Sequence, residues 1–101
     1  MSVYVDEAIW PFGGWVMCHM LADTPEELFD MAERLGMDRR YFQPRSAPHF
    51  DITTQMRAVA IQLGAIEIDK YRTVEIITRL RANPNPWLRV AQELERGRDD
   101  P

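Results

Sequence analysis

The order of apolar and polar positions along the chain predicts alternating strands and helices. Residues 3–6 and 15–21 carry the β-branched, aromatic and other apolar residues typical of short strands. The second segment is apolar on both faces except for His19, which suits a sheet covered by helices on both sides. Between the two strands, a proline and the pair Gly13-Gly14 indicate a loop over residues 8–14.

The clearest boundary in the chain is a helix start at residues 24–27. Thr24 is the expected N-cap, Pro25 takes the first helical position, and Glu27 completes a capping box. Apolar residues then recur at helical spacing until Gly36 ends the helix.

The middle of the chain continues this alternation. We expect a short strand at residues 40–43 and an irregular loop at 44–48, which holds two prolines. A helix capped by Asp51 or Thr53 then precedes a strand at residues 65–68.

Helices at about residues 72–82 and from Asn85 onward complete the pattern. The fold class that follows is α/β, with a small, mainly parallel sheet of three to four strands flanked by three to four helices. We assign residues 1–82 to this α/β domain. Residues 83–101 form a C-terminal helix and tail, packed on the domain or appended to it, whose charged end is expected to fray.

Composition places this domain in a reducing compartment and favours a cytoplasmic location. The 101 residues are 46 % hydrophobic, contain no apolar run long enough to span a membrane, and do not begin like a signal peptide. Cys18 is the single cysteine, which excludes an internal disulfide and favours a small buried apolar role. The net charge of −4 argues against general nucleic-acid binding.

Polar residues that do little for the fold gather at the predicted strand ends, where ligands bind in α/β sheets. Asp6, Asp23, Gln43 and the segment 44–51 are expected on one rim, whereas His19 lies within a strand. Both histidines have an aspartate within a few residues. Asp6, His19 and Asp23, together with His49 and Asp51, would suit a divalent metal such as Mn²⁺, Fe²⁺ or Zn²⁺, although the spacings match no established metal motif.

His49 and Asp51 are the candidate catalytic pair. A metal nearby could activate water against a phosphoryl or carbonyl centre. Without a metal, His49 could act as a general base oriented by Asp51. We expect His49 to be accessible to solvent, because it lies in a proline-containing loop where it does little for the fold. The structural alternatives are that Asp23 and Asp51 cap helices and that His19 is a core histidine.

Tyr4, Arg40, Gln43 and Arg57 are the candidate ligand-binding residues. The arginines could bind phosphate while Tyr41 or a neighbouring aromatic ring stacks on a base. The alternative is that basic residues follow a helix C-terminus and that the aromatic rings belong to the core.

Several short motifs in order resemble a known family. They are Tyr4-Val5-Asp6, Cys18-His19-Met20, Ala22-Asp23, Glu26-Glu27-Leu28, Arg40-Tyr41-Phe42-Gln43, Pro48-His49-Phe50-Asp51, Arg57 and Gly64-Ala65. Over residues 3–68 the chain is similar to the small bacterial and phage proteins of the domain-of-unknown-function family four-zero-three-one. That resemblance implies no established activity. The family pattern often has histidine at the position of Phe29, so a family site using that histidine would lack a ligand here.

Two functions from different classes remain open. The first is an uncharacterised bacterial or phage protein that binds a small phosphorylated or nucleotide-like ligand at the strand-end rim, with metal-assisted hydrolysis as its chemistry. The second is a non-catalytic interaction module that presents the helix of Trp87 or the aromatic loop at Trp10 and Phe12. The sequence leaves open whether the protein is an enzyme.

Overall fold

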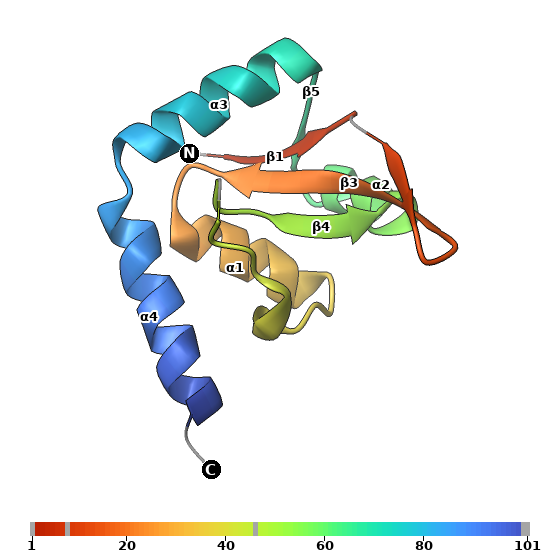
Figure 1. The fold of residues 1–101 in the computed structure, drawn as a ribbon. Helices are drawn as coiled ribbons and strands as arrows, with labels where there is room; N and C mark the ends of the chain where they lie inside the picture. Colours follow the sequence, from red (N-terminus) through yellow and green to blue (C-terminus); the bar gives the residue numbers. More distant parts are fainter. Residues whose placement is uncertain (1, 8, 46, 100–101) are drawn as a thin grey trace.

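A mixed five-stranded sheet with four α-helices forms the computed structural model (Figure 1). The structure describes residues 2–7, 9–45 and 47–99. Residue 8 of the predicted loop, residue 46 of the proline-containing loop and residues 100–101 of the predicted tail lie outside that part. The strands are β1 (Val3–Asp6), β2 (Trp10–Phe12), β3 (Trp15–Ala22), β4 (Phe50–Thr53) and β5 (Ile66–Ile68). The helices are α1 (Pro25–Arg34), α2 (Thr54–Gln62), α3 (Lys70–Ala82) and α4 (Asn85–Asp99), with a short 3-10 helix at Arg39–Tyr41.

The sheet is organised around β3. This strand pairs antiparallel with β1, β2 and β4, whereas β1 and β5 form a parallel pair. The prediction of a mainly parallel sheet of three to four strands is therefore wrong. β1 and β3 are antiparallel because the connection between them is short, whereas a parallel pair needs a crossover of a dozen or more residues.

Strand β2 lies in the segment that was predicted as a loop. Gly13 and Gly14 have φ angles of 57° and 85°, which a two-residue hairpin turn requires, and this turn connects β2 directly to β3. Pro11 is tolerated because β2 pairs only with β3, and a proline on an edge strand need not donate to a ladder.

Two other local predictions are also corrected. Residues 40–43 do not form a strand: Arg39–Tyr41 is a 3-10 helix, and Gln43 makes a single bridge with His49. Asp51 does not cap a helix but lies inside β4, and α2 starts at Thr54 with Thr53 as its N-cap.

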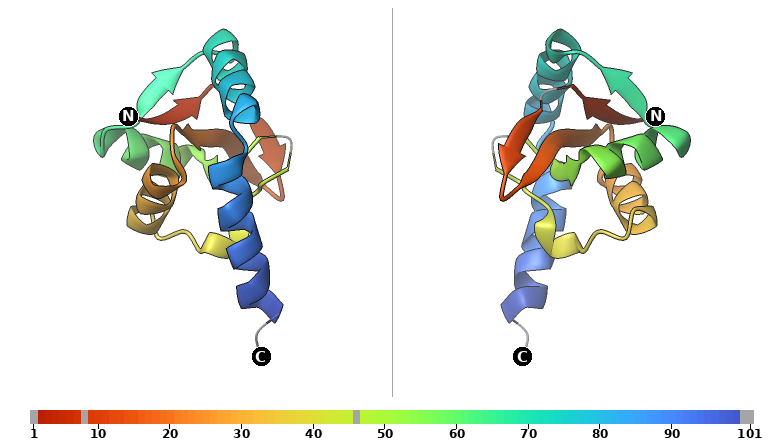
Figure 2. Two further views of the ribbon diagram at one scale, coloured as in Figure 1. Left: turned by 90° about the vertical axis from the view of Figure 1, so that its left-hand side faces the viewer. Right: turned by 90° about the vertical axis from the view of Figure 1, so that its right-hand side faces the viewer.

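Helices cover both faces of the sheet, as the apolar pattern indicates (Figures 1 and 2). The α1 start is confirmed, because the Thr24 hydroxyl accepts from the Glu27 amide at 3.3 Å and Pro25 follows the cap. Helices α1 and α2 lie on one face and α3 on the other, while α4 runs down the side next to α1. None of the helices in the described ranges combines the length and apolar character needed to cross a membrane.

The core lies mainly between the sheet and α1, where Met20, Leu28 and Phe50 are fully buried. Trp87 of α4 is buried as well, with its ring stacked 6.2 Å from that of Phe42. Trp87 itself is therefore part of the core, whereas the prediction that its helix forms a docking surface stays a prediction.

Candidate functional site

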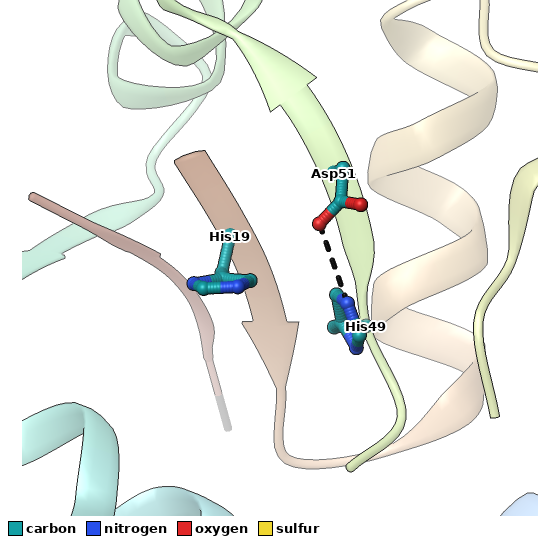
Figure 3. Close-up of side chains that lie close together, drawn as sticks. All are labelled: His19, His49 and Asp51. Carbon is teal, nitrogen blue, oxygen red and sulfur yellow. Dashed lines mark ion pairs between the residues drawn. The ribbon is translucent and has the colours of Figure 1, made fainter. Parts of the chain in front are cut away.

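The strand register places three polar side chains in one row across the sheet. His19 of β3 pairs with Asp51 of β4, and Asp6 of β1 follows the pair Val5–Met20, which brings it next to His19 on the other side. Side chains alternate between the two faces along a strand, so His49, two residues before Asp51, projects to the same face. Figure 3 shows the imidazoles of His19 and His49 and the Asp51 carboxylate on this face.

These donors are close enough to share one ion. One ring nitrogen of each histidine and one carboxylate oxygen of Asp51 all lie within 4.8 Å of one another. His49 Nε2 lies 3.3 Å from Asp51 Oδ1, which matches the separation of roughly 3.3–3.5 Å between ligands of a tetrahedral ion with bonds near 2.1 Å.

Each histidine has its Nδ1 engaged by a neighbour. His19 Nδ1 lies 2.6 Å from Asp6 Oδ2, and the other Asp6 oxygen accepts from the His19 backbone amide at 2.8 Å. His49 Nδ1 lies 2.7 Å from the carbonyl oxygen of Ala47. Because a carbonyl only accepts, His49 Nδ1 must carry the hydrogen. When each ring is neutral, Nε2 therefore carries the lone pair that can bind a metal ion, the arrangement that carboxylates and carbonyls impose on metal-binding histidines. In the metal-free protein, His49 Nε2 faces Asp51 Oδ1 instead.

The Asp51 carboxylate is held but incompletely satisfied. Its Oδ2 accepts from the side-chain amide of Gln43. Its buried Oδ1 lies 3.3 Å from His49 Nε2, and no hydrogen bond of good geometry reaches it from the described residues. A buried acceptor without a well-formed hydrogen bond is uncommon in proteins. Asp51 Oδ1 faces His49, where a cation would satisfy it.

The electrostatics of the pair favour charge on both partners. Burial lowers the pKa of His49, but the Asp51 carboxylate and the Ala47 carbonyl outweigh it, and the pKa lies above the ordinary 6.5. Burial raises the pKa of Asp51, but His49 and Gln43 outweigh it, and the pKa lies below 3.8. His49 is beside Asp51 as expected, but its side chain is only 15 % exposed, so it is less accessible than predicted.

A cavity of about 510 Å³ opens beside these donors. Asp51 and Gln43 line it together with Thr53. The rest of its lining is mostly apolar and comes from the β2–β3 hairpin, Met37, the 3-10 helix and the start of α2. The donor set is therefore not sealed in the core, and a small molecule in the cavity would reach the Asp51 side chain.

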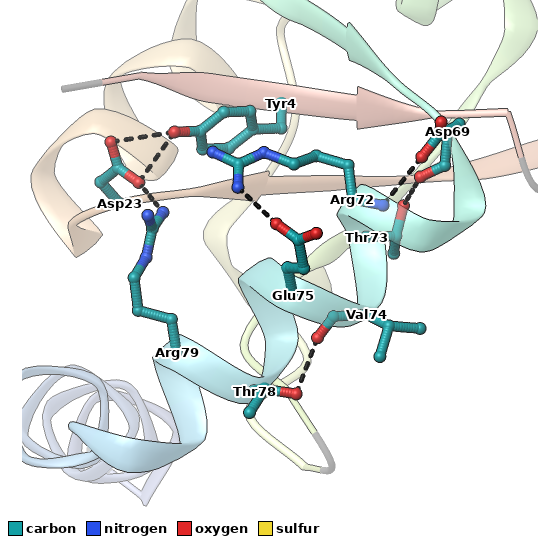
Figure 4. Close-up of polar contacts among 9 residues, drawn as sticks. All are labelled: Tyr4, Asp23, Asp69, Arg72, Thr73, Val74, Glu75, Thr78 and Arg79. Carbon is teal, nitrogen blue, oxygen red and sulfur yellow. Dashed lines mark hydrogen bonds and ion pairs between the residues drawn. The ribbon is translucent and has the colours of Figure 1, made fainter.

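Asp23 and Tyr4 belong to a different place. The Tyr4 hydroxyl donates to Asp23 at 3.0 Å, and Asp23 also accepts from the Ser2 amide and from Arg79 of α3 (Figure 4). Because β3 runs antiparallel to β1, the carboxyl ends of these two strands lie at opposite ends of the sheet. The expected rim containing both Asp6 and Asp23 is therefore wrong.

The candidate phosphate-binding arginines do not line the cavity. Arg57 donates to the backbone carbonyl of Asp6 at 2.9 Å and pairs with Glu67 at 3.2 Å. Arg40 is exposed and lies beside Asp38 and Tyr41. Of the four predicted ligand-binding residues, only Gln43 reaches the site, where it supports Asp51.

Two residues near the site do not serve it. The pKa of Cys18 is raised to about 11 by burial and by Asp6, so it is a neutral buried thiol at ordinary pH. Phe29, where the family pattern often has histidine, packs against Phe50, which points to the opposite face of β4 from Asp51. A histidine at that position would not join His19 and His49, so the cluster does not lack a ligand there.

The aromatic contribution to the site was not foreseen. Trp10 stacks on His19 with ring centroids 4.4 Å apart, and Trp15 and Met37 line the cavity. One feature of the sequence could have predicted it. The Gly13-Gly14 pair between apolar segments indicates a two-residue hairpin turn, and such a hairpin places Trp10 beside β3.

Comparison with known proteins gives one result. No curated protein and no solved structure matches the chain. A family model described as "Protein of unknown function (DUF4031)" matches residues 3–82, which include every residue of the histidine–aspartate cluster. By this match over most of its length, the chain belongs to that family.

Proposed function

We propose that the protein binds a divalent transition-metal ion through His19, His49 and Asp51, and that the ion activates water to hydrolyse a small ligand in the adjoining cavity. The observation that carries the proposal is the donor set itself. Three ligand atoms converge, both imidazoles are oriented by a second partner, and Asp51 Oδ1 is buried without a well-formed hydrogen bond.

The chemistry follows from the number and type of ligands. Two imidazoles and one carboxylate suit Zn²⁺, Fe²⁺ or Mn²⁺ and leave coordination positions for water and a ligand. A water bound to such an ion loses its proton near neutral pH and becomes a nucleophile. Asp6 and Gln43 would hold His19 and Asp51 in place, because each is hydrogen-bonded to one of these ligands.

The ligand would reach the ion from the cavity. A phosphorylated ligand remains compatible with this arrangement only if the ion itself holds the phosphate, because no arginine or lysine is among the described residues lining the cavity. A carbonyl or phosphoryl oxygen on the ion would be polarised in the same way.

Thermal unfolding with and without metal tests the metal site. Zn²⁺ or Mn²⁺ at about one hundred times its dissociation constant should raise the melting temperature by roughly 10 °C or more, because only the folded state holds the ligands together. Mg²⁺, which prefers oxygen ligands, should have little effect. His19→Ala, His49→Ala and Asp51→Asn should each reduce the shift, and the double change of both histidines should abolish it.

Glu33→Gln on the exposed surface of α1 is the matched control and should keep the full shift. An unchanged melting temperature of the wild type across these metals would contradict the proposal. Hydrolysis of p-nitrophenyl acetate and of p-nitrophenyl phosphate by the zinc-loaded protein checks the chemical step. If neither ester is cleaved faster than by the Asp51→Asn variant, the hydrolytic part of the proposal fails.

A second candidate function, the non-catalytic interaction module, is favoured by a different observation. At the tip of the β2–β3 hairpin, Phe12 is 71 % exposed and Trp15 58 % exposed. Exposed aromatic side chains that lie together are typical of contact surfaces. Exchanging both for serine should abolish capture of a protein partner under this function, and should leave the metal-induced stabilisation intact.

A further inference from the structure

The cavity beside the metal ligands has walls suited to a flat ring. Four aromatic side chains line it: Trp10, Phe12 and Trp15 from the β2–β3 hairpin and Tyr41 from the 3-10 helix. Methionines fill much of the remaining lining. Its volume of about 510 Å³ lies within the range of small-molecule sites. Trp15 and Tyr41 are more than half exposed, so a ring stacked on them would remove apolar surface from water.

The charges of the lining argue against an acidic occupant. Asp51 is the acidic residue among the described residues of the lining, and these residues include no arginine or lysine. In the metal-free protein, an anionic group between the aromatic walls would meet this carboxylate without an arginine or lysine among the described lining residues to balance it. An uncharged ring avoids that repulsion and can use the polar groups of Gln43 and Thr53 for hydrogen bonds.

The aromatic wall is continuous with the metal ligands. Trp10 lies against His19 with centroids 4.4 Å apart and planes inclined by 40°, and His19 meets His49 edge-on at 5.2 Å. Asp51 both lines the cavity and belongs to the donor cluster. A ring between these walls would therefore place its edge close to the ion.

We propose that this cavity binds the planar, uncharged aromatic ring of the substrate, a nucleobase or a comparable heteroaromatic ring, with its polar edge toward the metal site. Stacking on tryptophan and tyrosine accepts any flat π system, and hydrogen-bonding groups at one end fix its orientation. That the ring belongs to a substrate rests on the proposed function, whereas binding of the ring itself does not require the metal.

Tryptophan fluorescence can test ring binding directly. Two of the three tryptophans, Trp10 and Trp15, line the cavity, and the third, Trp87, is buried against Phe42. Adenosine and cytidine should quench the emission in a saturable way, with and without Zn²⁺. Ribose, which lacks the ring, should not. Trp15→Ala and Tyr41→Ala should each weaken binding roughly tenfold. The control Tyr71→Ala removes a still more exposed ring from α3, outside the cavity lining, and should have no effect.

Two further probes identify what is bound. Indole tests whether any heteroaromatic ring is accepted, and adenosine 5′-monophosphate tests whether a phosphate group drives binding. Binding of the nucleosides alone supports a nucleobase, and equal binding of indole supports a heteroaromatic ring in general. Binding of the monophosphate without adenosine overturns the proposal, as does wild-type affinity in both the Trp15 and Tyr41 variants. If Zn²⁺ stabilises the protein but no ring binds, this inference alone fails. If rings bind but no metal stabilises the protein, the metal proposal alone fails.

Discussion

The pairing of His49 with Asp51 can be predicted from the sequence. The residues that surround this pair in the folded protein cannot. Their spacing of two residues puts both on one face of any strand, so the sequence already indicates that they are neighbours. His19 joins them only through the register of β3 on β4, and Asp6 only through that of β1 on β3. No single-sequence pattern encodes register between strands of different hairpins, and the support of Asp51 by Gln43 was missed for the same reason.

In the metal-free protein this pair should make stability depend on pH. The folded pKa of His49 is above 6.5, so its contribution is fully present below about pH 6.5 and is lost as pH rises through the folded value. The folded pKa of Asp51 is below 3.8, so its contribution is present above about pH 3.8 and is lost as pH falls through the folded value. The pair is thus most stabilising in mildly acid solution.

Urea unfolding of wild type and His49→Gln, measured with a chelator present, checks this dependence. The loss of unfolding free energy caused by the substitution should be larger at about pH 6 than at about pH 9, where less of the wild-type His49 is protonated. An equal loss at both pH values would show that the protonated imidazole adds nothing through Asp51.

Helix starts were easier to predict than short strands. Thr24, Pro25 and Glu27 each satisfy a local requirement of a helix N-terminus, and local requirements are visible in a sequence. Residues 40–43 have the composition of a strand, but Asp38 accepts from the Arg40 amide and starts a 3-10 turn instead. Helix α4 was placed correctly from Asn85, yet its packing depends on Phe42, which is distant along the chain.

Trp87 should fasten α4 to the rest of the molecule. Its ring is 5 % exposed and stacks on Phe42, which in turn contacts Phe29 and Phe50. Trp87→Ala should therefore lower the free energy of unfolding by about 3–5 kcal/mol, the range for large aromatic residues removed from a core. The adjacent Leu88→Ala is the control, because Leu88 is 53 % exposed and should cost less than about 1 kcal/mol. Similar losses for both would contradict the packing described for α4.

The molecule has two polar clusters, which lie toward opposite ends of the strands of its sheet. The histidine–aspartate cluster lies toward the carboxyl end of β1, and the cluster of Tyr4, Asp23 and Arg79 lies toward the carboxyl end of β3 (Figure 4). If β1 and β3 were parallel, Asp6 and Asp23 would lie at the same end of the sheet, but the two strands are antiparallel. Strand direction depends on which segments pair. The short connection from β1 to β3 favours an antiparallel pair, although the helices farther along the chain suggest parallel crossovers.

Asp23 should therefore matter for stability and not for the metal. It joins the amide of Ser2, the Tyr4 hydroxyl and Arg79 of α3. Asp23→Asn should lower the free energy of unfolding by about 1–2 kcal/mol, because charge-assisted hydrogen bonds are lost at a partly exposed place. The increase in melting temperature on adding Zn²⁺ should be unchanged. A loss of the zinc effect would instead place Asp23 among the metal ligands.

The order of the strands along the chain also determines which of them can pair first during synthesis. Every donor and supporting group of the cluster lies between Asp6 and Asp51, and β1, β3 and β4 pair within residues 3–53. The parallel pair of β1 with β5 joins Tyr4 to Ile66 and requires closure of a much longer loop. A nascent chain therefore exposes all three proposed ligands before β5, α3 and α4 have left the ribosome. An ion bound at that stage would link β3 to β4, and Asp6 of β1 would contact the same site through His19.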